Sequence, residues 1–77
     1  MKKVTFDYSK LKGRIKEKCD TQRKYAVALG INEGTLAAKL SNKSYFTQSE
    51  IEKSIRILNL DPGTVSSYFF TTRVEKT

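Results

Sequence analysis

Residues 21–40, TQRKYAVALGINEGTLAAKL, decide the fold of this chain, because they predict two short helices joined by a tight turn. Ala26 lies where the first helix must approach the second, and a larger side chain would hold the two apart. Gly30 lies where a left-handed residue can end the first helix and turn the chain. Ile31 and Leu36 are placed to fill the angle between the helices. The pattern indicates a helix-turn-helix, the unit that places its second helix in the major groove of DNA.

The sequence on both sides of this unit predicts three more helices, because signals for a helix start recur. In one such signal, the hydrophobic staple, an apolar residue before the N-cap packs on a residue five positions later. Phe46, Thr47 and Ile51 fit this signal, and Thr47 with Glu50 adds a capping box. Apolar residues recur at spacings of three or four within each helix, which gives each one core face. We therefore expect one all-α domain over residues 1–77, a compact bundle whose tail, 71–77, is extended or disordered. The five expected helices cover residues 8–19, 22–29, 33–41, 48–58 and 62–69.

Composition favours a binding protein over an enzyme. The 77 residues include one cysteine and no histidine, so the chain lacks the ligands of a zinc site and the Ser-His or Cys-His pairs of nucleophilic catalysis. We expect no catalytic residue, no metal, no cofactor and no small-molecule substrate. No apolar run approaches the roughly 20 residues of a membrane span, and the first residues do not resemble a signal peptide. A reducing cytoplasm is the expected compartment, with no membrane partner.

The positive charge is concentrated in the first third of the chain. Of the formal net charge of +7, residues 1–24 carry +6, from nine Lys/Arg against three acidic residues. Residues 25–77 carry +1, from six Lys/Arg against five acidic residues. An uneven basic surface is typical of nucleic-acid binders. The alternative is a solvated lysine face that serves solubility.

The spacing Gln22-x3-Ala26-x3-Gly30-Ile31-x4-Leu36 resembles the helix-turn-helix of the lambda-repressor-like superfamily. More narrowly, GINEGTLAAKLSNKS at residues 30–44 is similar to the Cro and repressor (XRE-type) regulators of phages and prophages of Gram-positive bacteria. The resemblance implies a lambda-repressor-like five-helix bundle with its helix-turn-helix at 21–41. It also implies a sequence-specific transcriptional regulator, a Cro-like repressor of operator DNA in the bacterial nucleoid.

Matched positions in the family imply which residues would contact DNA. Residues 32–34 and 38 would face base edges, Gln22 would hold a phosphate, and residues 42–44 would contact the backbone. Helical geometry adds to the base-facing set the other residues on the outward face of the second helix of the motif. The base-facing set is Asn32, Glu33, Gly34, Thr35, Ala37, Ala38 and Ser41, and the phosphate set is Thr21, Gln22, Arg23, Lys24, Lys39, Asn42, Lys43, Ser44 and Tyr45.

Three members of the phosphate set have specific arguments for or against that role. Arg23 and Lys24 open a helix, where positive charge opposes the helix dipole unless a phosphate lies nearby. Lys39 takes a place that is often apolar in the superfamily. It either runs its stem along the edge of the core or reaches a phosphate.

The outward face of the second helix of the motif is made of small residues, and none of them can make a bidentate contact with a base. Two interpretations follow. Either the helix lies deep in the major groove and recognises the shape of the DNA, or its outward face is a binding surface for a helix of another protein. In the second case the chain is an antirepressor-like module that binds a repressor rather than DNA.

A homodimer is expected on DNA, because helix-turn-helix proteins commonly bind two half-sites. The last expected helix carries more large side chains than one face of a short helix can bury. The expected dimer interface is Val65, Tyr68, Phe69 and Phe70.

Overall fold

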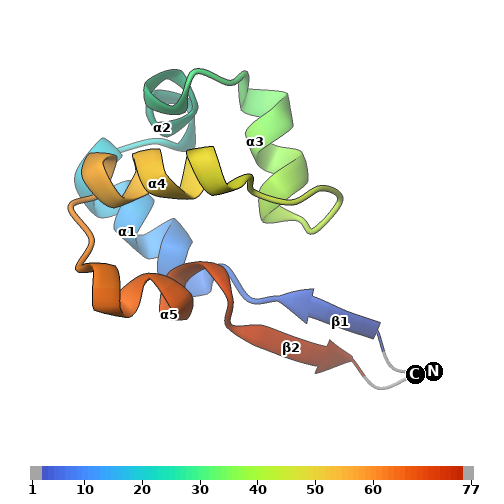
Figure 1. Cartoon of the computed structure of the whole chain (residues 1–77). Helices are drawn as coiled ribbons and strands as arrows, with labels where there is room; N and C mark the ends of the chain where they lie inside the picture. The colour runs from blue at the N-terminus through green and yellow to red at the C-terminus, as the bar shows by residue number, and fades with distance from the viewer. Residues whose placement is uncertain (1–2, 76–77) are drawn as a thin grey trace.

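Five helices and one small sheet make up the protein, as seen in a computed structural model that describes residues 3–75 (Figure 1). The five predicted helices are confirmed, with ends that differ by no more than one residue for the first four. The last differs more, because residues Pro62–Thr64 form a 3₁₀ turn before the α-helix begins. The elements are β1 (Lys3–Phe6), α1 (Ser9–Cys19), α2 (Gln22–Leu29), α3 (Glu33–Leu40), α4 (Gln48–Ile57), α5 (Val65–Phe69) and β2 (Thr72–Glu75).

Side-chain caps fix the starts of the three central helices. The Thr21 hydroxyl accepts a hydrogen bond from the Lys24 amide at 3.1 Å, and the Asn32 side chain accepts one from the Thr35 amide at 2.7 Å. At α4, Thr47 and Glu50 form the predicted capping box. These bonds satisfy amides that have no partner within their own helix.

The core lies where the five helices meet, and Tyr25 of α2 is at its centre with no exposed surface. Its hydroxyl forms a short hydrogen bond with the buried hydroxyl of Ser54, which in turn donates to the Glu50 carbonyl at 2.8 Å. The polar end of a large aromatic side chain is thereby satisfied inside the core. The apolar core residues are Tyr8, Leu11, Ile15, Tyr25, Ala26, Leu29, Leu36, Leu40, Leu58, Leu60 and Phe69.

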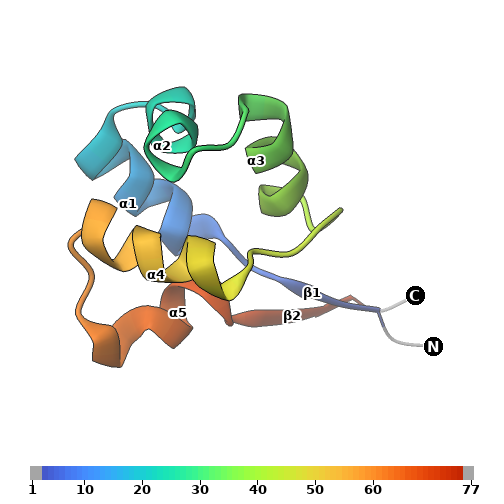
Figure 2. The ribbon, with the colours of Figure 1, turned by 45° about the horizontal axis from the view of Figure 1, so that its top comes forward.

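A two-stranded antiparallel ribbon joins the two ends of the described chain and projects away from the helices (Figures 1 and 2). Lys3 pairs with Glu75 and Phe6 with Thr72. The expected all-α fold class is confirmed: the fold is a mostly helical five-helix bundle, to which the described residues add only this small sheet. Within the expected tail, Thr72–Glu75 form β2, and residues 76 and 77 lie outside the described residues. Within residues 3–75, no helix is long and apolar enough to cross a membrane.

Candidate recognition surface of the helix-turn-helix

The turn between α2 and α3 has the geometry that the sequence predicted. Gly30 has a φ of 80°, and its amide donates to the Val27 carbonyl at 3.1 Å. The Ile31 amide donates to the Ala26 carbonyl at 3.0 Å, which closes the end of α2. Ala26 is buried against the core. The two helices of the motif are therefore held at a fixed angle, with the outer side of α3 open to solvent.

The outer side of α3 offers few polar groups to a partner. Most of the predicted base-facing residues are exposed, but Gly34 and Ala37 carry no polar side-chain atom. The Asn32 side chain is committed to the helix cap, and the Ser41 hydroxyl donates to the Ala38 carbonyl at 3.2 Å. Glu33 and Thr35 remain the exposed polar side chains of this face. Neither presents the paired donor and acceptor with which an amide reads adenine.

At the start of α2, the predicted phosphate ligands lie on the surface. Gln22 and Arg23 are exposed, and the Thr21 hydroxyl caps the helix. The Lys24 ammonium group lies 3.3 Å from the Asp20 carboxylate, and both side chains are well exposed. An exposed pair of this kind is weak, so Lys24 can exchange it for another anion.

Lys39 is placed differently, because its side chain is buried. The ammonium group lies 3.0 Å from the Glu50 carboxylate and donates to the Tyr45 carbonyl at 2.8 Å. Burial alone would raise the pKa of Glu50, but the Thr47 amide and the Lys39 ammonium hold it below its ordinary value. Lys39 thus ties α3 to the start of α4. The prediction that it contacts a phosphate does not fit this arrangement, since its charge is already paired inside the protein.

Asn42 also has a structural partner. Its side-chain amide bonds both the N–H and the C=O of Phe6, and its φ of 67° lies in the left-handed region that asparagine tolerates. In the same loop Ser44 is half-buried, whereas Lys43 and Tyr45 are exposed. Of the four loop residues expected at the DNA backbone, Lys43 and Tyr45 are the ones that face solvent.

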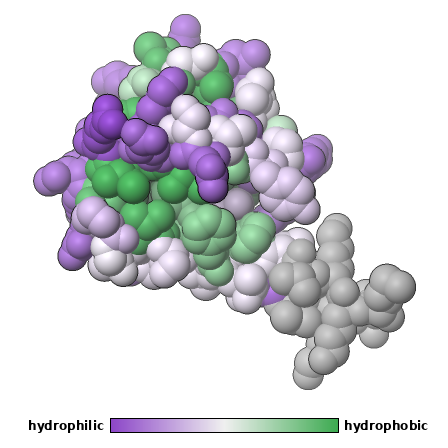
Figure 3. Space-filling model, in the orientation of Figure 1, coloured by the Kyte–Doolittle hydropathy of each residue, from purple (hydrophilic) through white to green (hydrophobic). Residues whose placement is uncertain are grey.

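An exposed aromatic patch, which we define as Tyr45 and Phe70 with Phe6, Phe46 and Ile51, surrounds a small hollow of about 40 Å³. The exposed fraction is 73% for Tyr45 and 52% for Phe70. Apolar side chains also gather on the face that carries α4 and α5 (Figure 3). Large aromatic residues left in water are typical of protein–protein contact sites.

The residues expected at a dimer interface divide between core and surface. Phe69 is only 2% exposed, and its ring packs edge-on against Phe46 with centroids 5.2 Å apart. Val65 and Tyr68 are half-buried against the same core. Phe70 is the member of the set that the fold leaves exposed, and its ring lies edge-on to Phe6.

The chain matches a known family over most of its length. The family model described as "Protein of unknown function (DUF739)" matches residues 4–72. The chain belongs to the DUF739 family. Among solved structures, it is similar to the solution structure of the modulator of repression (MOR) of the temperate bacteriophage TP901-1 from Lactococcus lactis. The identity is 43%, the match covers 84% of this chain and 88% of the phage protein, and the TM-score is 0.74. No curated protein matches the sequence.

In this DUF739 chain, the positive charge of the first third is partly internal, which the sequence did not reveal. The Arg14 guanidinium donates to the carbonyls of Leu58 and Asn59, both at 3.0 Å, and pairs with Glu17 at 2.6 Å. It therefore caps the end of α4. Carbonyls at a helix end attract arginine, but a partner 44 residues away cannot be found from local spacing.

Proposed function

We propose that this chain regulates phage repression by binding a repressor protein, and that the aromatic patch contacts this partner. The main support for this proposal is that Tyr45 and Phe70 are exposed around an apolar hollow. Aromatic anchors of this size dominate the energetics of many protein interfaces. The chain acts as a binding protein without catalysis, in the cytoplasm of the bacterial host.

Two further observations support the proposal. The outer side of α3 lacks bidentate readers of bases, while Lys39 and Asn42 are committed to contacts within the fold. The relative from TP901-1 is named a modulator of repression, and repression is the process that the proposal assigns to this chain. An antirepressor of this kind keeps the helix-turn-helix fold and uses it as a scaffold for a protein contact.

A second candidate is sequence-specific binding to operator DNA as a Cro-like homodimer. The observation that favours it is the charge of +6 on residues 1–24, together with the exposed Gln22 and Arg23 at the start of α2. If about six phosphates were neutralised, the log–log slope of affinity against salt would be roughly −5.

The test is a calorimetric titration of the chain against the repressor of its own phage, and in parallel against the operator duplex and a scrambled duplex. We expect a complex with the repressor, and Tyr45→Ser or Phe70→Ser should weaken it by about thirtyfold, as for an interface residue worth about 2 kcal/mol. Val27→Ser is the matched control, because Val27 of α2 is also 73% exposed but lies outside the patch.

A different result would favour the second candidate. Tight, salt-sensitive binding to the operator duplex, weak binding to the scramble and no complex with the repressor would refute the protein-partner proposal.

A further inference from the structure

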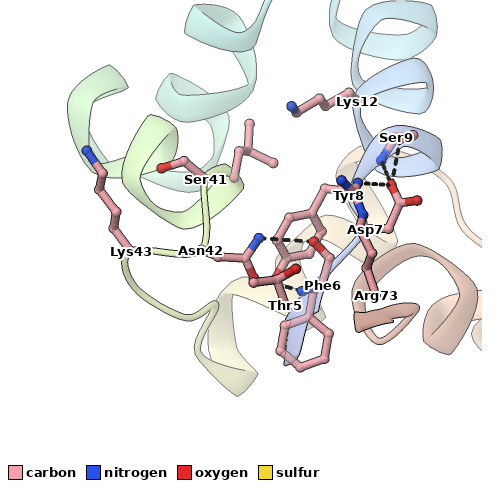
Figure 4. A pocket seen from close by; sticks show the side chains of 11 residues that line it. Thr5, Phe6, Asp7, Tyr8, Ser9, Lys12, Ser41, Asn42, Lys43 and Arg73 are labelled. Carbon is pink, nitrogen blue, oxygen red and sulfur yellow. Dashed lines mark hydrogen bonds and ion pairs between the residues drawn. The ribbon is translucent and has the colours of Figure 1, made fainter. Parts of the chain in front are cut away.

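Two hollows along α1 share Lys12 as a lining residue. The first, of about 420 Å³, lies between β1, the start of α1 and the end of α3, and Figure 4 shows Lys12 reaching from α1 toward the end of α3, where Ser41 lies. The second, of about 380 Å³, lies between α1 and the start of α2 and includes Lys16. Because Lys12 lines both hollows, we treat them as a single surface and call it the α1 groove.

Three lysines line the α1 groove. Lys12, Lys16 and Lys43 make no ion pair with any residue in the described range 3–75. The two carboxylates that line the groove lie near other cations, Asp7 3.4 Å from Arg73 and Asp20 3.3 Å from Lys24, and are outnumbered by the lysines. The groove therefore carries unbalanced positive charge.

This arrangement costs stability unless an anion binds. Lys12 and Lys16 are one turn apart on α1, a spacing at which like charges repel. The first turn of α1 contains no acidic residue to offset them. An anionic ligand in the groove would reduce this repulsion, so the groove is a candidate binding site.

The wall of the first hollow is held in place before any ligand binds. The Asn42 side chain bonds both backbone groups of Phe6, at 2.9 and 3.0 Å, so the loop after α3 is fixed against β1. A site that is already ordered loses less conformational entropy when a partner binds.

The shape and chemistry of the groove suit a polypeptide better than a nucleic acid. Each hollow is concave and within the size range of ligand pockets, about 300–1,000 Å³, so it admits a projecting side chain. The aromatic residues that line it are Phe6, which is half-buried, and Tyr8, which is only 5% exposed, so little ring surface is left for base stacking. Asp7 and Asp20, which line it, can accept hydrogen bonds from the backbone amides of a peptide, whereas a phosphate backbone has no N–H group to donate.

We propose that the α1 groove binds an acidic polypeptide segment of the repressor, with Lys12, Lys16 and Lys43 facing its carboxylates. This proposal rests on the proposed function, since it adds a second, charged contact to that of the aromatic patch. The patch supplies apolar anchoring, and the groove supplies charge complementarity, which selects the partner.

The first experiment omits the repressor and uses an alternating Glu-Gly peptide as the probe, with a Gln-Gly peptide as its neutral match. Amide chemical shifts of the ¹⁵N-labelled chain are followed during each titration. We expect the acidic peptide to shift the amides of Lys12, Ser41 and Lys43 and the neutral peptide to leave them unchanged. Shifts at these amides with a random DNA duplex but not with the acidic peptide would overturn the proposal in favour of a nucleic acid.

The second experiment measures repressor binding with charge-removing variants. Lys12→Gln and Lys43→Gln should each weaken it about three- to fivefold, the effect of one exposed charge pair. Lys53→Gln is the control, because Lys53 is exposed on α4 outside the groove. The thermal midpoint of Lys12→Gln should be unchanged or higher, which separates lost binding from misfolding.

The two proposals fail in different ways. Repressor binding that is lost in Tyr45→Ser but unaffected by Lys12→Gln and Lys43→Gln would overturn the groove proposal alone. Peptide shifts at the groove in a chain that forms no complex with the repressor would refute the proposed function and the repressor as the source of the segment, and would leave the groove as an acidic-peptide site.

Discussion

The side-chain amide of Asn42 substitutes for a β-strand on the outer edge of β1: its Oδ1 accepts from the Phe6 amide at 2.9 Å, and its Nδ2 donates to the Phe6 carbonyl at 3.0 Å. One residue after α3 thereby occupies the two backbone groups that a neighbouring strand would occupy. The strand beside the helix-turn-helix is fixed to the loop that follows its second helix, so the two cannot move independently.

Replacing Asn42 should therefore loosen both segments. We expect Asn42→Ala to lower the free energy of unfolding by about 2 kcal/mol, because it removes two hydrogen bonds and places alanine at positive φ. Asn42→Gly keeps the backbone freedom and loses only the amide, so about 1 kcal/mol is expected. Urea unfolding gives both values, and equal stability of Asn42→Gly and the parent chain would contradict the role of the amide.

The ion pair between Lys39 and Glu50 predicts a second, larger effect. Lys39→Met leaves the Glu50 carboxylate buried without its cation, which should cost about 2–4 kcal/mol in urea unfolding. Adding Glu50→Gln should recover part of this loss, since the remaining buried group is then neutral. Lys53→Met on the exposed side of α4 is the control and should change stability by less than about 0.5 kcal/mol.

The same pair predicts how stability depends on acid. Because the pKa of Glu50 is lowered in the folded protein from 4.5, its contribution is present above pH 4.5 and is lost as the pH falls through the lowered value. In Lys39→Met this acid-side loss should be smaller. Thermal midpoints measured between pH 2 and 6 test this, and parallel curves for the two proteins would argue against the coupling.

Tyr25 predicts sensitivity to alkali. Burial raises its pKa from 10 to about 12, so the folded state disfavours the phenolate. Its contribution to stability is complete below pH 10 and is lost between pH 10 and about 12. Tyr25→Phe should lower the free energy of unfolding by about 1 kcal/mol at neutral pH, because the hydrogen bond to Ser54 is lost. The stability of this variant should fall less steeply than that of the parent chain as the pH rises. Absorbance at 295 nm together with circular dichroism follows ionisation and unfolding in the same samples.

Two glycines predict opposite effects of the same substitution. An added Cβ meets no atom within 4 Å at either Gly13 or Gly30, so only backbone conformation distinguishes them. Gly30 has a φ of +80°, and Gly30→Ala should cost about 1 kcal/mol. Gly13 lies inside α1, and Gly13→Ala should add about 0.5–1 kcal/mol. Stabilisation of the chain by Gly30→Ala would show that the turn can be built another way.

The sequence predicted those parts of the fold that depend on neighbours in the chain. The caps at Thr21, Asn32 and Thr47 and the turn at Gly30 are local, because each partner lies within a few residues. The outward face of α3 followed from helical geometry in the same way.

Contacts between distant residues were missed. Lys39 was expected either along the edge of the core or at a phosphate, and its partner Glu50 was not found because it belongs to another helix. The role of Asn42 required knowledge of where Phe6 would lie, 36 residues away. Phe69 was expected at a dimer interface, whereas the fold buries it against Phe46, a residue outside its own helix. β1 was not predicted, because so short a strand cannot be recognised from its own sequence before its partner strand is known.

The pairing of β1 with β2 sets an order of events during synthesis. β1 is made first, but its ladder partner is the last described segment to be made, so Lys3–Phe6 must wait while all five helices are synthesised. The helices can form from local signals as the chain emerges, whereas closing the ribbon requires contacts across nearly the whole sequence. The first hollow of the α1 groove includes residues from both strands, Thr5 and Arg73, so it is completed last. A ribosome-bound chain would then have a formed helix-turn-helix while still lacking part of its binding surface.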